Sequence, residues 1–262
     1  MDQPHRFPKI DNRLVLQSVS RALDVLEAFA ASPGPKSLGQ IAQAAGINKS
    51  AAQRISQTLL GRGYLEQTEN GNLRLGRLLL DRSFDYLRSD TLIERAMPVL
   101  MDLRKAAGER IDLSLFDATY NNLSTVYAAR LQSKRETFYA TLTGRRHPTF
   151  ATTGGRACLA LLPDEAVRDI LERSSMTPVT PKTIVTIKGV FEKVREARHD
   201  GYAWAAEETL LGEVALAAAI RRPDGTPIGA VHIAGSLSEW AVEDFRHRFA
   251  PLAMAAAAAL RG

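Results

Sequence analysis

The feature that most constrains this chain is the order of its first segments, three helical patterns followed by a tight hairpin. Apolar residues recur at three- and four-residue steps in three stretches, which is typical of amphipathic helices. The hairpin is predicted from two strand-like runs on either side of Asn70-Gly71, a pair that favours a tight turn. The helical stretches are 17–30, 37–46 and 48–61, and the strand-like runs are 64–67 and 73–75.

Local signals mark the ends of these helices. Gln40 stands in the reciprocal capping-box position to Ser37, and Gly46 ends the second helix. The residues predicted to begin the three helices are Ser18 or Ser20, then Ser37, then Asn48 or Lys49. The apolar stripe of the first helix is Val19, Leu23, Leu26 and Phe29, and that of the third is Ala52, Ile55, Leu59 and Leu60.

Three helices followed by a hairpin is the layout of a winged helix-turn-helix. No Asp or Glu occurs between Glu27 and Glu66, a pattern that favours approach to phosphates because a carboxylate would repel them. The basic residues in this interval are Lys36, Lys49, Arg54 and Arg62. The alternative is a small helical packing domain that lacks acids by chance. The agreement of element order, turn chemistry and charge favours the DNA-binding interpretation.

The remainder of the chain predicts an α+β domain reached through a linker helix. Strands are predicted at 111–116, 122–129, 137–142, 202–206, 214–221 and 228–235, and helices at 163–173 and 190–199 and from about 238 onward. Gly201 is a predicted helix C-cap. The predicted organisation is a tail at 1–15, a winged helix-turn-helix at 16–76, a linker helix at 77–90 and an α+β domain at 91–262.

Composition excludes several classes of protein. Hydrophobic residues make up 45% of the 262 residues and charged residues 24%, as in ordinary globular chains. No apolar run is long enough to span a bilayer, and the polar N-terminus is not a signal peptide, so we expect a cytoplasmic protein with no membrane partner. One cysteine, Cys158, and five scattered histidines exclude an internal disulfide framework and argue against a zinc site. We expect no metal and no cofactor.

Short motifs along both halves of the chain follow the order of a known family. In the N-terminal half they are Ser20–Leu26, Ile41-Ala42, Gly46–Ser50, Arg54 and Gly63–Leu65. In the C-terminal half they are Gly144–Pro148, Gly155–Ala160, and Gly201-Tyr202 followed by Glu207-Glu208 and Gly212. From about Gln17 to Arg261, the chain resembles the IclR family of bacterial transcription regulators. The order and spacing of the motifs carry the resemblance, and no single motif does.

The resemblance implies a winged helix-turn-helix joined to a GAF-like effector-binding domain, in a homodimer or homotetramer. Two departures affect the ligand and not the fold. The chain has Gly155-Arg156 where the family commonly has Gly-Lys, and Ala218–Ile220 where the family often has proline. The expected partners are double-stranded operator DNA and a small-molecule effector, and the effector's identity is left open by these departures.

The DNA-binding residues are predicted on the third helix and on the hairpin. Gln53 is the best candidate to read a base, because Gln can bond adenine bidentately. Arg54 either grips a phosphate or pairs inside the domain. Solvation of the hairpin tip is the alternative to DNA contact for its residues. The full predicted set is Lys36, Lys49, Ser50, Gln53, Arg54, Asn72 and Arg74.

The effector-binding residues are predicted from the resemblance, which implies a cup between the sheet and its loops. The predicted lining is Tyr139, Gly154, Gly155, Ala205, Glu213, Ala215 and His232. In the alternative, Glu213 lies on the rim and His232 packs within the sheet. If both face the cavity, a buried Glu213 disfavours a purely anionic effector unless His232 or Arg156 compensates it. A small hydroxylated or nitrogen-containing metabolite is therefore favoured, with an aromatic one suggested by Tyr139.

Two patterns suggest catalysis, and neither is convincing. Cys158 could be a nucleophile with His147 or His199 as base, but it lies in an apolar helical stretch where cysteine behaves as a small hydrophobe. Glu207 and Glu208 are adjacent and would point to opposite faces of a strand. We therefore predict a ligand-responsive regulator with no enzymatic activity. The open alternatives are a small-molecule enzyme fused to a DNA-binding domain and a sensor module that binds another protein.

Overall fold

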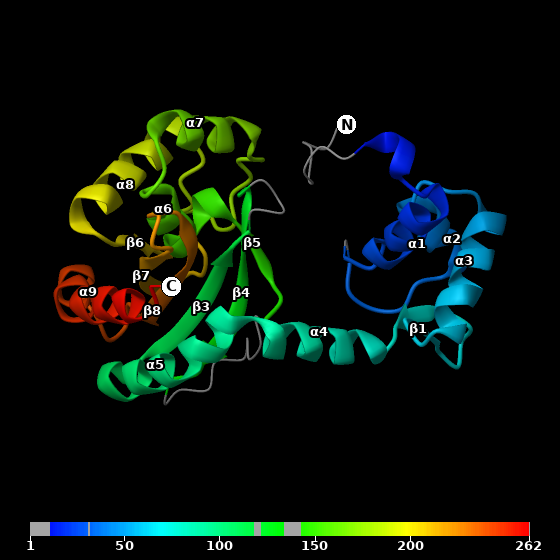
Figure 1. Cartoon of the computed structure of the whole chain (residues 1–262), viewed down its shortest axis with the longest axis horizontal. Helices are drawn as coiled ribbons and strands as arrows, with labels where there is room; N and C mark the ends of the chain where they lie inside the picture. Colours follow the sequence, from blue (N-terminus) through cyan, green and yellow to red (C-terminus); the bar gives the residue numbers. More distant parts are fainter. Residues whose placement is uncertain (1–10, 31, 118–121, 134–142, 262) are drawn as a thin grey trace. The chain divides into compact units, whose positions relative to one another are not determined.

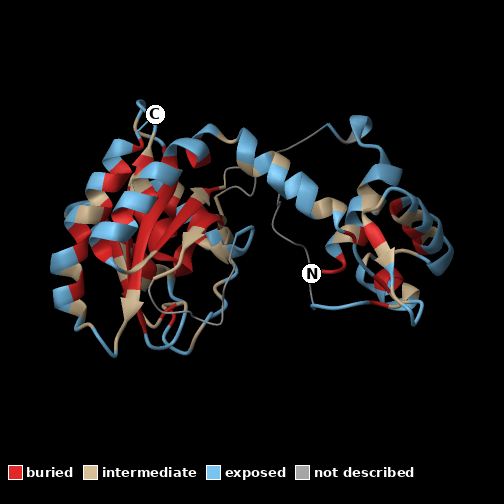
Figure 2. Cartoon of the chain, turned by 90° about the horizontal axis from the view of Figure 1, so that it is seen from below, coloured by how far each residue is buried: buried red, intermediate tan, exposed pale blue. Residues whose placement is uncertain are grey.

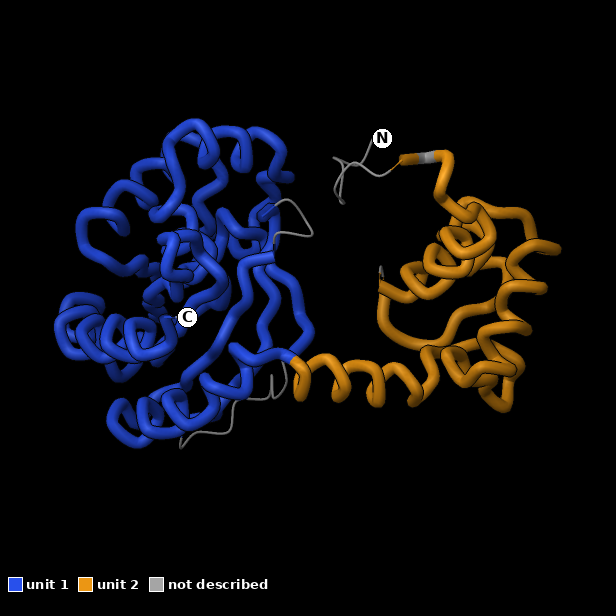
Figure 3. Tube along the Cα trace, viewed as in Figure 1, with its two compact units in different colours: residues 1–8, 90–262 blue, residues 9–89 orange. Residues whose placement is uncertain are grey.

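The computed structural model describes residues 11–30, 32–117, 122–133 and 143–261. The chain divides into two compact units, Lys9–Ser89 and Asp90–Gly262 (Figure 3). The predicted strand at 137–142 and most of the predicted turn at 117–121 lie outside the described residues.

In the described part of the N-terminal unit, three helices and a two-stranded hairpin precede helix α4, in the order predicted for a winged helix-turn-helix (Figure 1). A short 3-10 turn, Asn12–Leu14, precedes the first helix. Strands β1 and β2 pair antiparallel, and Lys36 adds an isolated bridge to Leu73. The elements are α1 (Gln17–Glu27), α2 (Leu38–Ala44), α3 (Lys49–Gly61), β1 (Leu65–Gln67) and β2 (Leu73–Leu75).

Two of the predicted helix starts are confirmed. Ser37 and Gln40 form the reciprocal capping box of α2, and the Asn48 side chain accepts a bond from the Ala51 N–H at 2.8 Å to begin α3. The predicted cap of α1 is wrong, because its N-cap is Leu16, which offers no side-chain bond. The backbone hydrogen bonds of its first turn run from the Val19 and Ser20 N–H groups to the Leu16 carbonyl.

The predicted apolar stripe of α1 is only partly right. Val19 and Leu23 are 52% and 54% exposed, whereas Val25 and Phe29 are buried with Ile41 in the core of this unit. The helix carries two apolar rows at i, i+4 spacing, and only one row can face α2 and α3. Periodicity alone cannot choose between two apolar rows, and packing selects the row that contains Val25.

Helix α4 (Leu78–Ser89) has no buried residue, and Figure 2 shows exposed and intermediate residues along it. Phe84 is 62% exposed and Leu80 is 71% exposed, while Leu79 and Leu87 are half-buried. A helix that buries none of its apolar residues gains little from packing within its own unit. These side chains are therefore available to a partner.

Within the residues that the structure describes, the C-terminal unit is built on a six-stranded antiparallel sheet with the order β5-β4-β3-β8-β7-β6 (Figure 1). The α+β prediction is confirmed, and the short strand β5 was not predicted. The strands are β3 (Arg110–Phe116), β4 (Ser124–Leu131), β5 (Arg146–Pro148), β6 (Ala203–Ala206), β7 (Glu213–Arg221) and β8 (Pro227–Ser236). The helices are α5 (Thr91–Ala107), the 3-10 turn Thr149–Ala151, α6 (Thr153–Leu159), α7 (Asp164–Arg173), α8 (Ile187–Asp200) and α9 (Val242–Ala259).

The two faces of this sheet differ in chemistry. Helices α5 and α9 cover one face, where β3 and β8 contribute buried aliphatic residues such as Leu113 and Ile233. Helix α6 covers the opposite face, where the same strands contribute Asp112, Ser114 and His232. Successive side chains of a strand point to opposite faces of the sheet. The register that places the aliphatic row against α5 and α9 therefore also places the polar row beneath α6.

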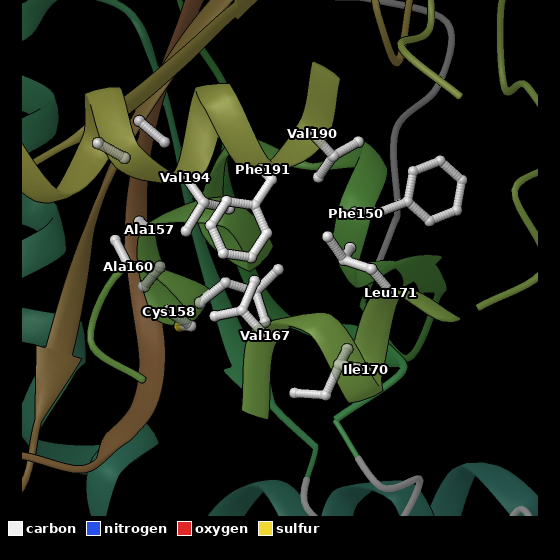
Figure 4. Close-up of a cluster of buried hydrophobic side chains, with 14 of the residues drawn as sticks. Phe150, Ala157, Cys158, Ala160, Val167, Ile170, Leu171, Val190, Phe191 and Val194 are labelled. Atoms are coloured by element: carbon white, nitrogen blue, oxygen red, sulfur yellow. The ribbon is translucent and has the colours of Figure 1, made fainter. Parts of the chain in front are cut away.

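Helices α6, α7 and α8 pack together through the apolar cluster shown in Figure 4. Cys158 is a member of this cluster, where Figure 4 labels it. The cluster fixes α6 in place, and α6 in turn covers the polar row of the sheet. Among the described residues, no helix is long and apolar enough to cross a bilayer.

Candidate functional site

The exposed face of α3 carries four of the predicted DNA-binding residues. Lys49 and Ser50 occupy its first turn, and Gln53 and Arg54 lie one turn further along; all four are exposed. Within the part of the chain that the structure describes, Arg54 has no acidic partner, so the predicted internal pairing is not observed. The backbone N–H groups at the start of α3 add partial positive charge to this end of the helix.

A groove of about 750 Å³ between α1 and α3 extends this surface. It is lined by Gln53, Arg54 and Gln57 from α3 and by Ser18 and Arg21 from α1. Arg21 was not predicted as a DNA-binding residue, because sequence reasoning assigned α1 only to packing. Its exposed side chain places a further cation beside Arg54.

The two predicted wing residues have different surroundings. The Arg74 guanidinium donates to Glu66 Oε2 at 2.8 Å, while half of its side chain stays exposed. The Arg77 N–H and then the Arg74 guanidinium hold the pKa of the Glu66 carboxyl below its ordinary value. Asn72 is half-buried beside the turn at Gly71, whose φ of 77° is the left-handed conformation that glycine allows. The Arg74 side chain is therefore partly exposed, but its charge is paired with that of Glu66.

Lys36 differs from the other predicted DNA-binding residues and is a correction to that set. It is 8% exposed, and its Nζ donates to the Ser32 carbonyl at 3.1 Å and to the Ser32 hydroxyl at 2.5 Å. Its backbone also pairs with Leu73. The Lys36 side chain folds back and donates hydrogen bonds to oxygen atoms of the loop before α2. Its ammonium is therefore not exposed to solvent, and a phosphate contact would require that exposure.

The C-terminal unit contains a cleft of about 430 Å³ at one end of the polar row of the sheet. Its floor is Arg110 of β3, Glu213 of β7 and Ala234 of β8. Leu210 and Leu211 border it from the loop between β6 and β7. The other lining residues are Gly108, Glu109, Ser133, Gly212, Gly235, Ser236 and Glu239.

A chain of buried ion pairs runs beneath this cleft. The Arg110 guanidinium donates to Glu213 Oε2 at 2.6 Å and to Asp112 Oδ2 at 3.0 Å. Arg130 donates to the other oxygen of Asp112 at 2.6 Å. Asp112 is 1% exposed, a burial that a carboxylate tolerates here because two guanidinium groups neutralise it. The four charges balance, and Arg110 and Glu213 form the end that reaches the cleft.

His232 lies further along the same face and is enclosed by protein. Its Nε2 lies 2.7 Å from Ser114 Oγ and its Nδ1 lies 3.2 Å from Thr153 Oγ1. A Cβ at Gly154 would overlap the imidazole, so Gly154 is the residue that lets α6 approach this histidine. Burial is the main cause that lowers the pKa of His232 to about 4. The geometry agrees with a histidine that packs within the sheet.

We expect His232 to make stability depend on pH. Its pKa in the folded chain lies below the ordinary value of 6.5, so the unfolded chain binds the proton first as pH falls. The contribution of His232 is therefore complete above about pH 6.5 and is lost toward pH 4, at up to about 1.4 kcal/mol per pH unit. Urea unfolding over this range should show a weaker loss for His232→Gln than for wild type. The matched control is His199→Gln, whose side chain is 91% exposed; equal pH slopes for the two variants would contradict the expectation.

The predicted effector residues are not all gathered in one cavity. Glu213 lines the cleft, whereas Ala205 and Ala215 are buried on neighbouring strands. Gly155 packs against the Thr149 backbone, where a Cβ would overlap the carbonyl oxygen, and this contact gives it a structural role. Tyr139 lies outside the described residues.

Arg110 is the main residue that sequence reasoning missed in the cleft. The sequence did contain a signal for it, because Arg110 and Asp112 are two charged residues at alternate positions of a strand that is otherwise mostly apolar. Charged side chains in such a strand are rarely buried without a partner of opposite charge.

Arg156 does not compensate Glu213, which corrects that alternative. Arg156 is fully buried and forms a bidentate pair with Glu208, at 2.8 Å from Nη1 and 2.6 Å from Nη2. It also donates to the Phe150 carbonyl at 2.8 Å, and Glu208 accepts from the Ile184 N–H at 2.9 Å. The pair therefore ties α6 to the loop after β6 and to the segment before α8.

The structure gives no support to catalysis at Cys158 or at the paired glutamates. Cys158 is fully buried, burial raises the pKa of its thiol, and its Sγ contacts the Gly229 carbonyl. Glu207 lies beyond β6 with a φ of 61°, so the two glutamates are not neighbours on a strand. Among the described residues, no group of three acidic, histidine or cysteine side chains could hold a metal ion.

Comparisons with known proteins agree with this two-part organisation. Residues 18–69 match the IclR helix-turn-helix domain, and residues 84–261 match the bacterial transcriptional regulator IclR C-terminal domain. The chain is 29% identical over 224 residues to the transcriptional repressor IclR of Escherichia coli K12, covering 85% of this chain and 81% of that one. It is 27% identical over 220 residues to the regulator XynR of the same organism, covering 84% and 86%.

Solved structures show the same fold. A transcriptional regulator from Rhodococcus sp. RHA1 has a TM-score of 0.78 at 28% identity, covering 94% of this chain and 97% of that one. An IclR homologue from Microbacterium hydrocarbonoxydans, solved in complex with 4-hydroxybenzoate, has a TM-score of 0.75 at 22% identity, covering 94% and 98%. With both of its domains matched in order across residues 18–261, this chain belongs to the IclR family of bacterial transcriptional regulators.

Proposed function

We propose that this chain binds operator DNA as a homo-oligomer through α3 and the wing, and that a small metabolite in the C-terminal unit controls that binding. The observation that carries the proposal is the exposed, acid-free face of α3 with Lys49, Ser50, Gln53 and Arg54. A protein that acts on the bacterial chromosome works in the cytoplasm, where we place it. Lys36 is not part of the proposed surface, and Arg21 is added to it.

The two ends of the proposed surface have different roles. Gln53 presents an amide that can donate and accept at one base edge, which gives sequence discrimination. Lys49 presents a charge that attracts any phosphate, which gives affinity without discrimination. Arg21 and Arg54 flank the groove beside Gln53 and supply further phosphate contacts.

We expect Gln53→Ala to relax base preference at one operator position by about 1 to 3 kcal/mol. Lys49→Ala should weaken binding to all duplexes alike and make the salt dependence shallower by about one unit of slope per protomer. The measurement is selection from random duplexes by the full-length protein, followed by binding isotherms. Gln43→Ala, an exposed glutamine on α2, is the matched control. An unchanged sequence profile for Gln53→Ala would remove Gln53 as the base reader.

The cleft between Glu213 and Leu211 is the proposed effector site. Its volume of about 430 Å³ falls within the range of small-molecule pockets. The Microbacterium homologue in complex with 4-hydroxybenzoate supports the proposal, because it shows that a protein of this fold can hold a small aromatic molecule. We therefore propose a small aromatic or hydroxylated metabolite as the class of effector.

The route from the cleft to the DNA-binding unit starts at β3. Helix α5 follows the linker helix α4 in sequence, and Arg110 begins β3 after Gly108 and Glu109, which follow the end of α5. A ligand that changes the Arg110–Glu213 pair therefore acts on the first strand of the unit, which the 17 residues of α5 connect to the linker helix α4. A thermal-shift screen of metabolites, followed by operator binding with each stabilising compound, tests effector control.

A further inference from the structure

We propose that this cleft selects effectors that carry a protonated amine or a related cationic nitrogen group, in preference to simple carboxylic acids. The inference rests on the proposed function of the cleft as the effector site. It identifies Glu213 as the residue that determines this preference and Arg110 as its positioning partner.

The charges that line the cleft are predominantly negative. Glu109, Glu213 and Glu239 contribute three carboxylates, and Arg110 is the one cationic side chain among the described residues of the lining. Glu109 also accepts a bond from the Trp240 indole at 2.8 Å, which fixes its carboxylate at the cleft. An anionic ligand would enter against this excess of negative charge, while a cationic ligand would reduce it.

Arg110 is already committed to two carboxylates. Its Nε bonds Asp112 and its Nη1 bonds Glu213, so a ligand carboxylate would become the third anion around one guanidinium. The charge of Asp112 is shared with Arg130, which is likewise bonded to it. The network of ion pairs therefore has no cation without a carboxylate partner that could attract an acid. A guanidinium N–H of this network can still donate a hydrogen bond to a neutral oxygen of a ligand.

Glu213 is in the opposite situation. It is 9% exposed and pairs with Arg110 through Oε2, while within the described residues no group donates to its Oε1. Among the described residues, Ser56 Oγ is the only side-chain polar atom that lacks a hydrogen-bond partner and is sealed from solvent. Glu213 Oε1 therefore keeps access to solvent, and Glu213 lines the cleft. A mostly buried carboxylate oxygen that faces a cavity is an acceptor for an N–H donor, most favourably a charged one.

The remainder of the cleft suits an apolar body attached to this head group. Leu210 and Leu211 are 37% and 57% exposed at its border, and Ala234 and Gly235 also line it. Ser236 and Ser133 add polar groups elsewhere on the lining. The site therefore combines one acidic anchor with apolar walls, which fits an amine joined to a ring or a short aliphatic chain.

The test uses three probes that share one ring and differ in head-group charge: 4-hydroxybenzylamine, 4-hydroxybenzamide and 4-hydroxybenzoate. Calorimetry on the full-length protein near neutral pH should give an affinity for the amine at least about tenfold above that for the acid. A thermal-shift panel of paired amines and acids with other skeletons extends the comparison, and we expect the stabilising compounds to be amines.

The variant Glu213→Gln keeps the size of the side chain and removes its charge. We expect it to reduce the affinity for the amine by about tenfold and to change that for the amide by less than about twofold. Glu192→Gln, an exposed glutamate on α8, is the matched control and should leave all three affinities unchanged. The melting temperature of each variant without ligand shows whether it is folded.

Three outcomes would overturn the inference. Tighter binding of the acid than of the amine would do so while leaving effector binding at the cleft intact. An unchanged amine affinity in folded Glu213→Gln would remove Glu213 from recognition. Failure of every amine in the panel to stabilise the protein at millimolar concentration would reject the ligand class, and failure of the acids as well would also count against the cleft as an effector site.

Discussion

Replacing Glu208 with Gln is expected to lower the free energy of unfolding of the C-terminal unit by about 3 to 5 kcal/mol. The substitution keeps the shape of the side chain, so the cost comes from the charge and not from a cavity. Arg156 would remain fully buried with no anion to neutralise it, since its other partner is the neutral Phe150 carbonyl. The loop after β6 would also lose the carboxylate that accepts the Ile184 N–H.

Urea unfolding followed by circular dichroism measures this loss. The matched control is Asp169→Asn, which removes the charge from an exposed pair with Arg173 on α7 and should change stability by less than about 1 kcal/mol. The double variant Arg156→Met with Glu208→Leu should recover much of the loss, because no charge is then buried. A loss below about 1 kcal/mol for Glu208→Gln would show that the buried pair is not a main support of this unit.

Replacing Phe84 with Glu is expected to separate the protein into monomers and to lower operator affinity by about a hundredfold or more. A charge on the exposed apolar side of α4 would be costly to bury against a second copy of the chain. A monomer contacts one half-site of a palindromic operator, and it loses the gain from two linked DNA-binding heads. Light scattering gives the mass, and a binding isotherm on the selected duplex gives the affinity.

Arg82→Glu is the matched control, because it places the same residue on the opposite side of α4. Arg82 lies in an exposed pair with Asp85, and its loss should matter little for assembly. Leu80→Glu should reproduce the effect of Phe84→Glu, since both side chains are exposed on one side of the helix. A wild-type protein that is monomeric at micromolar concentration would contradict the proposed assembly.

Sequence reasoning was most reliable where the signal was local. The capping box of Ser37 and Gln40, the Asn48 cap and the left-handed Gly201 at the end of α8 each depend on residues within one turn. These signals gave the order of helices and strands that the structure confirms. Strand boundaries were also close, because the polar and apolar residues that alternate along β3 are next to each other in the chain.

The errors in the candidate sites came from contacts between residues that are distant in sequence. The assignment of Lys36 to DNA failed because a bridge to Leu73 draws this residue into the base of the wing. The partner of Glu213 could not be read from the sequence, because Arg110 lies 103 positions away. The residues next to Arg156 in the sequence gave no indication that it would form an ion pair with Glu208, since that pair depends on how α6 packs onto the sheet.

The measurement that tests the central claim most directly is the affinity of the full-length protein for its selected duplex as a function of salt concentration. We predict that selection yields two inverted half-sites and that the logarithm of the binding constant falls linearly with that of salt, by about 0.9 for each phosphate contacted. The slope should become shallower by about one unit per protomer in Lys49→Ala. Failure to enrich any duplex, or an affinity that does not fall with salt, would contradict a DNA-binding role and favour a protein partner.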